Sequence, residues 1–219
     1  MIVQAGRAAL SLALAVYEAV AAILAVRLRR PALVESARRS SQAILALASL
    51  AVLAMALLLL QRDYQVLYVY EHVNSSLSSL YAAAALWAGP EGSLLLWLWL
   101  LSLFAFLISR QKAPWARDLE PYALAVISLT QGFFALLLCS VNRPFVLLPA
   151  RAIEGSGLNP LLENPAMIFH PPALFAGYAA YTVPFAYAVA ALASGRLDGQ
   201  WLSGARRWNL LAWGLLGLG

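Results

Sequence analysis

Five charge-poor segments, each about as long as a membrane-spanning helix, limit what this chain can fold into. A helix needs roughly 20 mainly apolar residues to cross the hydrocarbon core of a bilayer. The segments that meet this requirement are residues 8–26, 43–60, 92–109, 122–141 and 173–194. A sixth segment, residues 210–219, is incomplete, because a helix of that length rises only about 15 Å. We therefore expect an all-α, polytopic integral membrane helix bundle, with residues 1–219 forming a single transmembrane helical domain of a longer protein.

The composition agrees with this prediction, since 63% of the residues are hydrophobic and only 11% are charged. In soluble domains about a quarter of the residues are charged. The first apolar segment is long and no A-x-A site follows it, so we expect it to stay in the protein as a helix. The sequence contains no P-loop, HExxH, GxSxG or complete dinucleotide motif, which excludes the enzyme classes that those motifs mark.

The basic residues are distributed unequally among the connecting segments. Cytoplasmic loops of membrane proteins carry an excess of Lys and Arg. The segments after the first, third and fifth apolar segments hold eleven of the 15 basic residues: Arg27, Arg29, Arg30, Arg38, Arg39, Arg110, Lys112, Arg117, Arg196, Arg206 and Arg207. We therefore expect the N-terminus on the outer side, with long outer loops at residues 61–91 and 142–172. This asymmetry accounts for the net charge of +5 without a nucleic-acid partner.

The second outer loop leads into the sequence NPLLENPAMIFHPPALFAGY, residues 159–178. Proline is favoured in the first turn of a helix, and the residue before proline is disfavoured in helical conformation. Pro171 and Pro172 should therefore start the fifth membrane helix, with His170 just ahead of it at the outer face. The positive end of a helix dipole favours a neutral imidazole, which is the form that binds iron. The alternative is a histidine that only caps a helix end or bonds a carbonyl.

The first outer loop contains YVYEHVNSSLSSLYAAAALW, residues 68–87. We expect an interfacial helix that starts near Asn74 and leads to Trp87. Glu71 lies beside His72, and a neighbouring carboxylate can fix the tautomer of a histidine at a metal site. A polar interfacial turn without a ligand is the alternative.

The next stretch, WAGPEGSLLLWLW at residues 87–99, combines a sharp turn with the entry into the third helix. Ser93 is a plausible N-cap for that helix. Trp87 fits the aromatic belt at the membrane interface. Trp97 and Trp99 are two residues apart and point to different faces of the helix, so only one of them can line a shared surface. The tryptophans form either an interfacial belt or a flat apolar surface for a large planar ligand.

Polar residues inside the apolar segments leave a second function open. Glu18 should be protonated or hydrogen-bonded, with Gln131 as a candidate partner, because intramembrane carboxylates are costly. Together with Pro184, these residues would suit a transporter or channel subunit. The polar features concentrate in the outer loops, however, which disfavours this alternative. A non-catalytic scaffold that docks other proteins is the third possibility.

Several long motifs carry a resemblance to a known family. They are WAGPEGSLLLWLWLLSLFA at 87–105, NPLLENPAMIFHPPALFAGYAAYTVPFAYAVAAL at 159–192, RRWNLLAWGLLGLG at 206–219, and EHVNSSL around His72. These motifs resemble the haem lyase component of bacterial cytochrome c maturation, the CcmF/NrfE family. The first 60 residues match that family only in hydropathy. Some members have His or Gln where this sequence has Pro90, so no ligand is assigned to that turn.

The resemblance implies a function on the outer face of the bacterial inner membrane. The protein would receive haem, its cofactor, from a membrane-anchored haem chaperone. It would then promote thioether attachment to the CxxCH cysteines of apocytochrome c, together with other cytochrome c maturation membrane proteins. By direct match His170 would bind the haem iron, and His72 would support the outer surface. The haem would stack on aromatic residues, for which Trp87, Trp97 and Trp99 are the candidates. No catalytic residue is assigned, and the family's other haem ligands would lie after Gly219.

Overall fold

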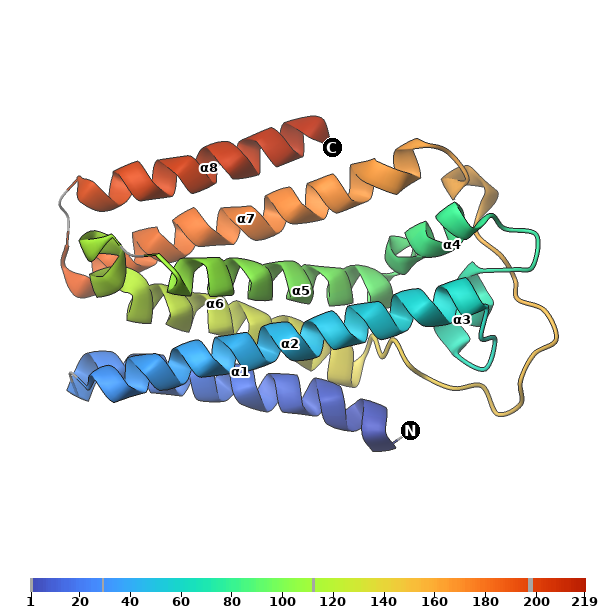
Figure 1. The fold of residues 1–219 in the computed structure, drawn as a ribbon, viewed down its shortest axis with the longest axis horizontal. Helices are drawn as coiled ribbons and strands as arrows, with labels where there is room; N and C mark the ends of the chain where they lie inside the picture. Colours follow the sequence, from blue (N-terminus) through green and yellow to red (C-terminus); the bar gives the residue numbers. More distant parts are fainter. Residues whose placement is uncertain (1, 29, 112, 197–198) are drawn as a thin grey trace.

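The structure is a computed structural model that describes residues 2–28, 30–111, 113–196 and 199–219. Six long helices run side by side along the molecule (Figure 1). They are α1 (Ile2–Leu28), α2 (Pro31–Gln61), α5 (Pro90–Ser109), α6 (Pro114–Ser140), α7 (Ala166–Ser194) and α8 (Gln200–Leu218). Short helices lie in the longer connections: α3 (Leu67–His72), α4 (Ser79–Ala84), and the 3-10 turns η1 (Ala85–Trp87) and η2 (Pro160–Leu162).

The predicted class, an all-α polytopic membrane protein, is confirmed. Four helices in the described part of the chain are long and apolar enough to cross a membrane, namely Pro31–Gln61, Pro90–Ser109, Trp115–Ser140 and Ala166–Ser194. Helix α5 shows why its residues form such an element. Pro90 and Glu91 occupy its first turn, where a missing N–H costs nothing and a carboxylate suits the helix dipole. A leucine-rich run follows without interruption up to Ser109.

Most helices extend beyond the apolar segments that predicted them. The segment 43–60 lies within α2, which starts at Pro31 and includes Arg38 and Arg39. The segment predicted as an incomplete helix at 210–219 belongs to α8, which starts at Gln200 and has 19 residues. A charged residue ends an apolar pattern but does not end a helix, because arginine is a good helix former whose long side chain can reach toward water. Helix α7 likewise starts before the predicted end of the second outer loop at residue 172.

Helix α5 lies at the centre of the bundle, where it packs against α2, α6 and α7, while α1 packs against α2 and α6. The face of α7 that is buried in the bundle is made of small residues, among them Ala179, Ala180, Ala186 and Ala190. Small residues let helix backbones approach closely in membrane proteins. On another side of α7, Gly177 provides the space for Leu216 of α8. This contact places the last turns of α8 beside the first turns of α7.

The connections between the long helices separate to the two ends of the bundle (Figure 1). The short α1–α2, α5–α6 and α7–α8 connections lie together at one end, which we call the basic end because Arg30, Arg110 and Arg196 are found there. Helices α3 and α4 and the long 141–165 segment lie at the opposite end. The short basic connections and the long connections therefore lie at opposite ends of the bundle, as the charge distribution predicts. The assignment of the basic end to the cytoplasm stays a prediction.

A bidentate ion pair joins α2 to α6 near the basic end. The Nε and Nη2 atoms of Arg38 each lie 2.6 Å from a carboxylate oxygen of Glu120, whose side chain is buried. Paired hydrogen bonds of this kind fix the relative orientation of the two groups. The carboxylate of Glu120 is thereby satisfied inside the bundle.

Glu18 is also buried, but its environment differs from the predicted one. In the described part of the chain neither carboxyl oxygen of Glu18 has a hydrogen-bond partner, although the Ser41 hydroxyl lies beside it. Gln131 instead faces α5, where its amide donates to the Ser102 hydroxyl over 3.1 Å. The predicted bond between Glu18 and Gln131 is therefore wrong, because α6 turns Gln131 toward a different neighbour.

Candidate functional site

The connections opposite the basic end form one unit, the loop cap, which consists of residues 62–89 and 141–165. Its two segments are joined by the isolated bridge Val66–Leu147 and by backbone hydrogen bonds from Leu67 to Val146, Leu148 to Gln65, and Ser156 to Tyr70. Arg62, in the left-handed conformation with φ 53°, ends α2. Its side chain donates to the carbonyls of Asn74 and Leu77, which folds the first segment back over the helix end. The loop cap is therefore braced by bonds within and between its segments.

One carboxylate oxygen of Glu154 accepts several hydrogen bonds within the loop cap. Its Oε1 atom accepts hydrogen bonds from the backbone N–H of Ser75 at 2.8 Å, the N–H of Gly155 at 3.0 Å and the hydroxyl of Tyr64 at 3.0 Å. Hydrogen bonds, first those from Ser75, lower the pKa of Glu154 to about 2. The ionised carboxylate is the form that these donors bind, so it joins the second segment of the cap to the first.

Glu154→Gln should loosen the loop cap and remove part of its dependence on pH. A carboxyl whose pKa is lowered by folding stabilises the folded state above its ordinary pKa of 4.5 and loses this effect as the pH falls toward 2. The protection factors of residues 141–165 in the wild type, which correct for the intrinsic pH dependence of amide exchange, should therefore fall as the pH is lowered from 4.5 toward 2. The variant should exchange faster at neutral pH and respond less to acid. Glu163→Gln, at an exposed position on the same segment, is the matched control. Equal exchange in the two variants would contradict the role of Glu154.

His72 is packed into the loop cap. Its ring stacks on Tyr68 with 4.3 Å between the ring centroids, and its Nδ1 lies 2.8 Å from the Tyr68 carbonyl oxygen. The proton in the neutral ring therefore belongs on Nδ1, and Nε2 faces Gly89, where a Cβ would lie only 2.7 Å away. The prediction that Glu71 fixes the tautomer of His72 is wrong. The backbone carbonyl of Tyr68 bonds the ring instead, and the Glu71 side chain is exposed.

The predicted interfacial helix near Asn74 also needs correction. Asn74 lies in a turn, where its Oδ1 accepts a hydrogen bond from the backbone of Leu77. Helix α4 begins after this turn, and the Ser78 hydroxyl caps it by accepting from the N–H of Tyr81. A serine cap fits this position because the first N–H groups of a helix lack intrahelical partners.

The entry into α5 is shaped by glycines that make room for neighbours. Gly89 is the N-cap residue, so the prediction of Ser93 as N-cap is wrong, and the Ser93 hydroxyl instead donates to the Trp87 carbonyl at 3.1 Å. A Cβ at Gly92 would overlap the Leu86 carbonyl oxygen and would lie 2.5 Å from the Tyr68 hydroxyl. Among the described residues the glycines with positive φ are Gly157 and Gly195. The glycines of this turn are thus required for packing and not for a left-handed backbone.

His170 lies within α7 and not ahead of it. The helix begins at Ala166, whose N–H is capped by the Asn164 side chain at 3.0 Å. Pro171 and Pro172 therefore lie in its second turn, and the prediction that they start the helix is wrong. The Asn164 side chain satisfies the first N–H group of the helix, so α7 starts at Ala166, five residues before Pro171.

Trp87 compensates for one of these prolines. Pro171 has no N–H, so the Met167 carbonyl four residues earlier lacks its usual helical donor. The indole Nε1–H of Trp87 donates to that carbonyl over 2.7 Å. Trp87 therefore connects the loop cap to the turn of α7 that carries His170, which allows the helix to pass through the two prolines.

Trp87→Phe should destabilise this junction by about 1–2 kcal/mol, since it keeps an aromatic ring but leaves the Met167 carbonyl without its donor. Chemical denaturation of the purified full-length protein measures the change. Trp213→Phe is the control, because the Trp213 side chain is 68% exposed. Equal losses in the two variants would show that the indole hydrogen bond contributes nothing.

His170 is exposed on α7. Its Nδ1 contacts the backbone carbonyl oxygen of Gly219 at the end of α8. In a neutral ring this contact places the proton on Nδ1 and leaves Nε2 as an unprotonated nitrogen. Phe169 beside it is also exposed, at 58%.

An aromatic cluster lies further along α7. Trp97 of α5 stacks on Tyr178 at 5.8 Å between ring centroids and also contacts Phe175 and Phe134. Tyr178 is eight residues after His170 on α7, so the two lie about 12 Å apart along the helix axis. Trp99 points the other way and donates to the Ser49 hydroxyl of α2 at 2.9 Å. As the two-residue spacing predicts, only Trp97 faces α7.

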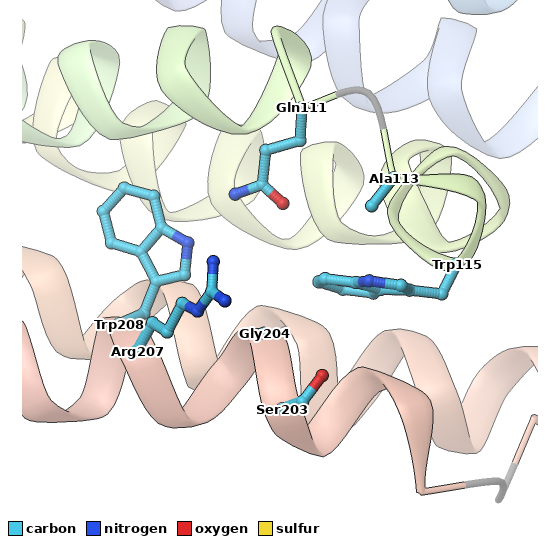
Figure 2. A pocket seen from close by; sticks show the side chains of 7 residues that line it. All are labelled: Gln111, Ala113, Trp115, Ser203, Gly204, Arg207 and Trp208. Carbon is cyan, nitrogen blue, oxygen red and sulfur yellow. The ribbon is translucent and has the colours of Figure 1, made fainter.

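A cavity at the basic end was not predicted from the sequence. It has a volume of about 460 Å³ and is lined by Gln111, Ala113, Trp115, Ser203, Gly204, Arg207 and Trp208 (Figure 2). These residues come from the α5–α6 connection, the first turn of α6 and the first half of α8, and no motif joins them. The sequence signal that could have indicated this cavity is a tryptophan beside basic residues near a helix end, as at Trp115 and at Trp208. Among the described residues, no group of three or more His, Cys, Asp or Glu side chains is placed to hold a metal ion.

Residues 87–219 match the family model described as cytochrome C assembly protein. The chain is 43% identical over 160 residues to the cytochrome c-type biogenesis protein CcmF of Escherichia coli strain K12, covering 72% of this chain and 24% of that protein. It is 35% identical over 221 residues to the cytochrome c-type biogenesis protein CycK of Bradyrhizobium diazoefficiens, and this match covers 100% of this chain and 34% of CycK. A solved structure of the cytochrome c heme lyase CcmF superimposes with a TM-score of 0.81 at 28% identity. The superposition covers 97% of this chain and 34% of the CcmF chain. The chain thus spans about a third or less of the length of these relatives.

Proposed function

This chain belongs to the cytochrome c assembly protein family, and on that premise we propose that its full-length protein is a haem lyase of cytochrome c maturation. Haem is the group that it handles, and apocytochrome c is the acceptor. The similarity to proteins named for cytochrome c biogenesis and haem lyase activity supports this proposal.

The geometry of His170 carries the proposal within this chain. Histidines that bind a metal commonly donate their other ring N–H to a carboxylate or a backbone carbonyl. The contact of Nδ1 with the Gly219 carbonyl has this form, and it leaves the exposed Nε2 as the free nitrogen. A single imidazole suits an iron ion whose other ligands are the nitrogens of a porphyrin. The residues present therefore fit haem, whose iron His170 would bind.

The remaining residues have positioning roles in this proposal. Trp87, which belongs to the loop cap, holds the turn of α7 on which His170 lies. The ring cluster of Trp97, Phe175 and Tyr178 supplies an apolar aromatic surface along the same helix. His72, packed between Tyr68 and Gly89, supports the cap. Trp99 supports the bundle through its bond to Ser49. Neither His72 nor Trp99 needs to contact the haem.

The chemistry requires haem to be held with its vinyl edge open. Haem supplies two vinyl groups, and each adds the S–H of one apocytochrome cysteine to form a thioether, with sulfur bonded to one vinyl carbon and the hydrogen to the other. The protein contributes orientation of the two reactants, which can account for a large part of a rate enhancement. A membrane haem chaperone delivers the haem, and other maturation proteins present the apocytochrome.

The bundle has its loop cap on the outer face of the bacterial inner membrane. The basic end, with Arg30, Arg110 and Arg196, then faces the cytoplasm according to the positive-inside rule. This orientation places His170 on the side where secreted cytochromes are assembled.

Complementation tests the function directly. The full-length protein is expressed in a bacterium that lacks its own haem lyase but retains the other maturation proteins, and covalent haem in a c-type cytochrome is measured by peroxidase staining of denaturing gels. We expect covalent haem to return. Correctly inserted protein that restores none would overturn the proposal.

A further inference from the structure

We propose that the cavity at the basic end binds the phosphate group of an anionic phospholipid, with the acyl chains lying along α5 and α8. The proposal concerns the end of the bundle opposite His170 and does not depend on the haem lyase function. It rests on four features of the cavity: its aromatic walls, its cation, its level in the bundle, and the apolar surface that continues from it.

The walls of the cavity are fixed by their neighbours. The Trp115 ring lies against the backbone of α8 at Gly204, where no Cβ would fit, and meets Tyr187 edge-on at 5.4 Å between centroids. Trp208 is held in the same edge-on way by Phe104 at 5.6 Å. The two indoles therefore keep their positions without a ligand, and a preformed pocket of this kind loses little entropy on binding.

The cavity contains a cation and an amide directed toward its centre. Figure 2 shows the Arg207 guanidinium between the two indoles and the Gln111 amide on the opposite wall. Within the part of the chain that the structure describes, Arg207 takes part in none of the ion pairs. The Gln111 oxygen accepts from the Tyr187 hydroxyl at 3.1 Å, which leaves its NH₂ group available as a donor. A guanidinium and an amide N–H together suit an oxyanion with several acceptor atoms, such as phosphate.

The level of the cavity in the bundle identifies the source of the phosphate. Its residues lie just after the end of α5, at the start of α6 and in the first turns of α8. This is the zone in which tryptophan and arginine meet lipid headgroups, and basic pockets between membrane helices bind anionic headgroups. Leu107 of α5 and Leu211 of α8 lie about one helical turn closer to the bilayer centre and are 41% and 45% exposed. Leu211 is four residues after Arg207 on α8, so its exposed apolar side chain lies on the same helix face as Arg207, toward the bilayer centre, where an acyl chain would lie.

Native mass spectrometry of the delipidated full-length protein in detergent tests this assignment. Phosphatidylglycerol should bind with a defined stoichiometry of one at this site, and phosphatidylcholine of the same chain length should bind at least about tenfold more weakly. Arg207→Gln should weaken phosphatidylglycerol binding about tenfold or more, because it removes charge-assisted hydrogen bonds.

The matched control is Arg206→Gln. Arg206 and Arg207 are both exposed, and Arg206 carries the same charge one residue earlier on α8 but does not line the cavity. Its loss should change phosphatidylglycerol binding by less than about twofold, since a rim charge acts only through a screened field. Trp115→Leu provides a second variant, in which one wall is reduced while the charge stays, and should weaken binding as well.

Three outcomes would overturn the proposal. Equal losses for Arg207→Gln and Arg206→Gln would show a non-specific attraction to the basic end. Inorganic phosphate that displaces the lipid at millimolar concentration would indicate a soluble phosphate compound as the ligand. Absence of bound phosphatidylglycerol from the full-length protein would show that another part of the protein fills the cavity.

Discussion

His170→Ala should reduce the yield of holocytochrome c at least about tenfold while the full-length protein still inserts into the membrane. The Nε2 of His170 is exposed and its Nδ1 contacts the Gly219 carbonyl, so alanine removes the ring nitrogen that we assign to the haem iron. Even the loss of an outer partner of a metal ligand commonly costs 10–100-fold in metal affinity or activity, and loss of the ligand itself should cost no less. Peroxidase staining measures covalent haem, and immunoblotting of washed membranes measures insertion.

Two further measurements separate ligation from a structural effect of the substitution. Phe169→Ala changes an exposed neighbour on the same turn of α7 and should leave the yield within about twofold of wild type. In His170→Ala, the haem that co-purifies with the full-length protein should have an altered Soret band, and added imidazole should restore the wild-type band. Holocytochrome at the wild-type level in inserted His170→Ala protein would refute the role of this histidine.

The membrane helices could be predicted because hydropathy is a local property of the sequence. The segment 92–109 differs by only two residues from α5, which spans Pro90–Ser109. The prediction was poorest where helices continue into charged sequence, as at Arg38 of α2 and Arg206 of α8. Hydropathy detects the part of a helix that lies in hydrocarbon, whereas helix formation depends on backbone hydrogen bonds that continue into the interface.

The sequence indicated which residues belong to the candidate site, but it did not indicate which atoms they contact. The proline rule placed the start of α7 at Pro171, and it failed because Trp87, distant in sequence, supplies the donor that the Met167 carbonyl lacks. The partner of His72 was expected to be its neighbour Glu71, and it is the carbonyl of Tyr68, one helical turn away. In both cases the deciding interaction is fixed by the fold, which local sequence rules do not contain.

The cavity at the basic end could not be predicted for a related reason. Trp115 and Arg207 are 92 residues apart in the sequence, and they meet only because α8 returns beside the start of α6. Each residue taken alone is typical of a membrane interface. Only the close contact of Trp115 with Gly204 shows that an indole is held against α8 and not left free in the headgroup region.

Gly92→Ala should destabilise the full-length protein by about 3 kcal/mol, the upper part of the range for overpacked sites. The new Cβ would overlap the Leu86 carbonyl oxygen and would approach the Tyr68 hydroxyl to 2.5 Å. That hydroxyl donates to the Ala85 carbonyl and accepts from the N–H of Gly89, so its displacement would break the hydrogen bonds that hold α3 against the entry into α5. A backbone oxygen cannot move aside as the end of a flexible side chain can, and the loop cap should therefore open before the bundle does.

Gly214→Ala is the control for this prediction, and it should change stability in the opposite direction. Gly214 lies inside α8, and alanine is the better helix former by about 1 kcal/mol. Among the described residues, apart from its chain neighbours and the nearby backbone of α8, none has an atom within 4 Å of the position that a Cβ would take. Chemical denaturation gives both free energies of unfolding, and hydrogen exchange shows where each variant opens. Exchange in Gly92→Ala should increase in residues 62–89 while α7 and α8 stay protected. If both variants stabilise the protein, helix propensity outweighs the overlap, and the close packing of Tyr68 on this turn does not determine the stability of the loop cap.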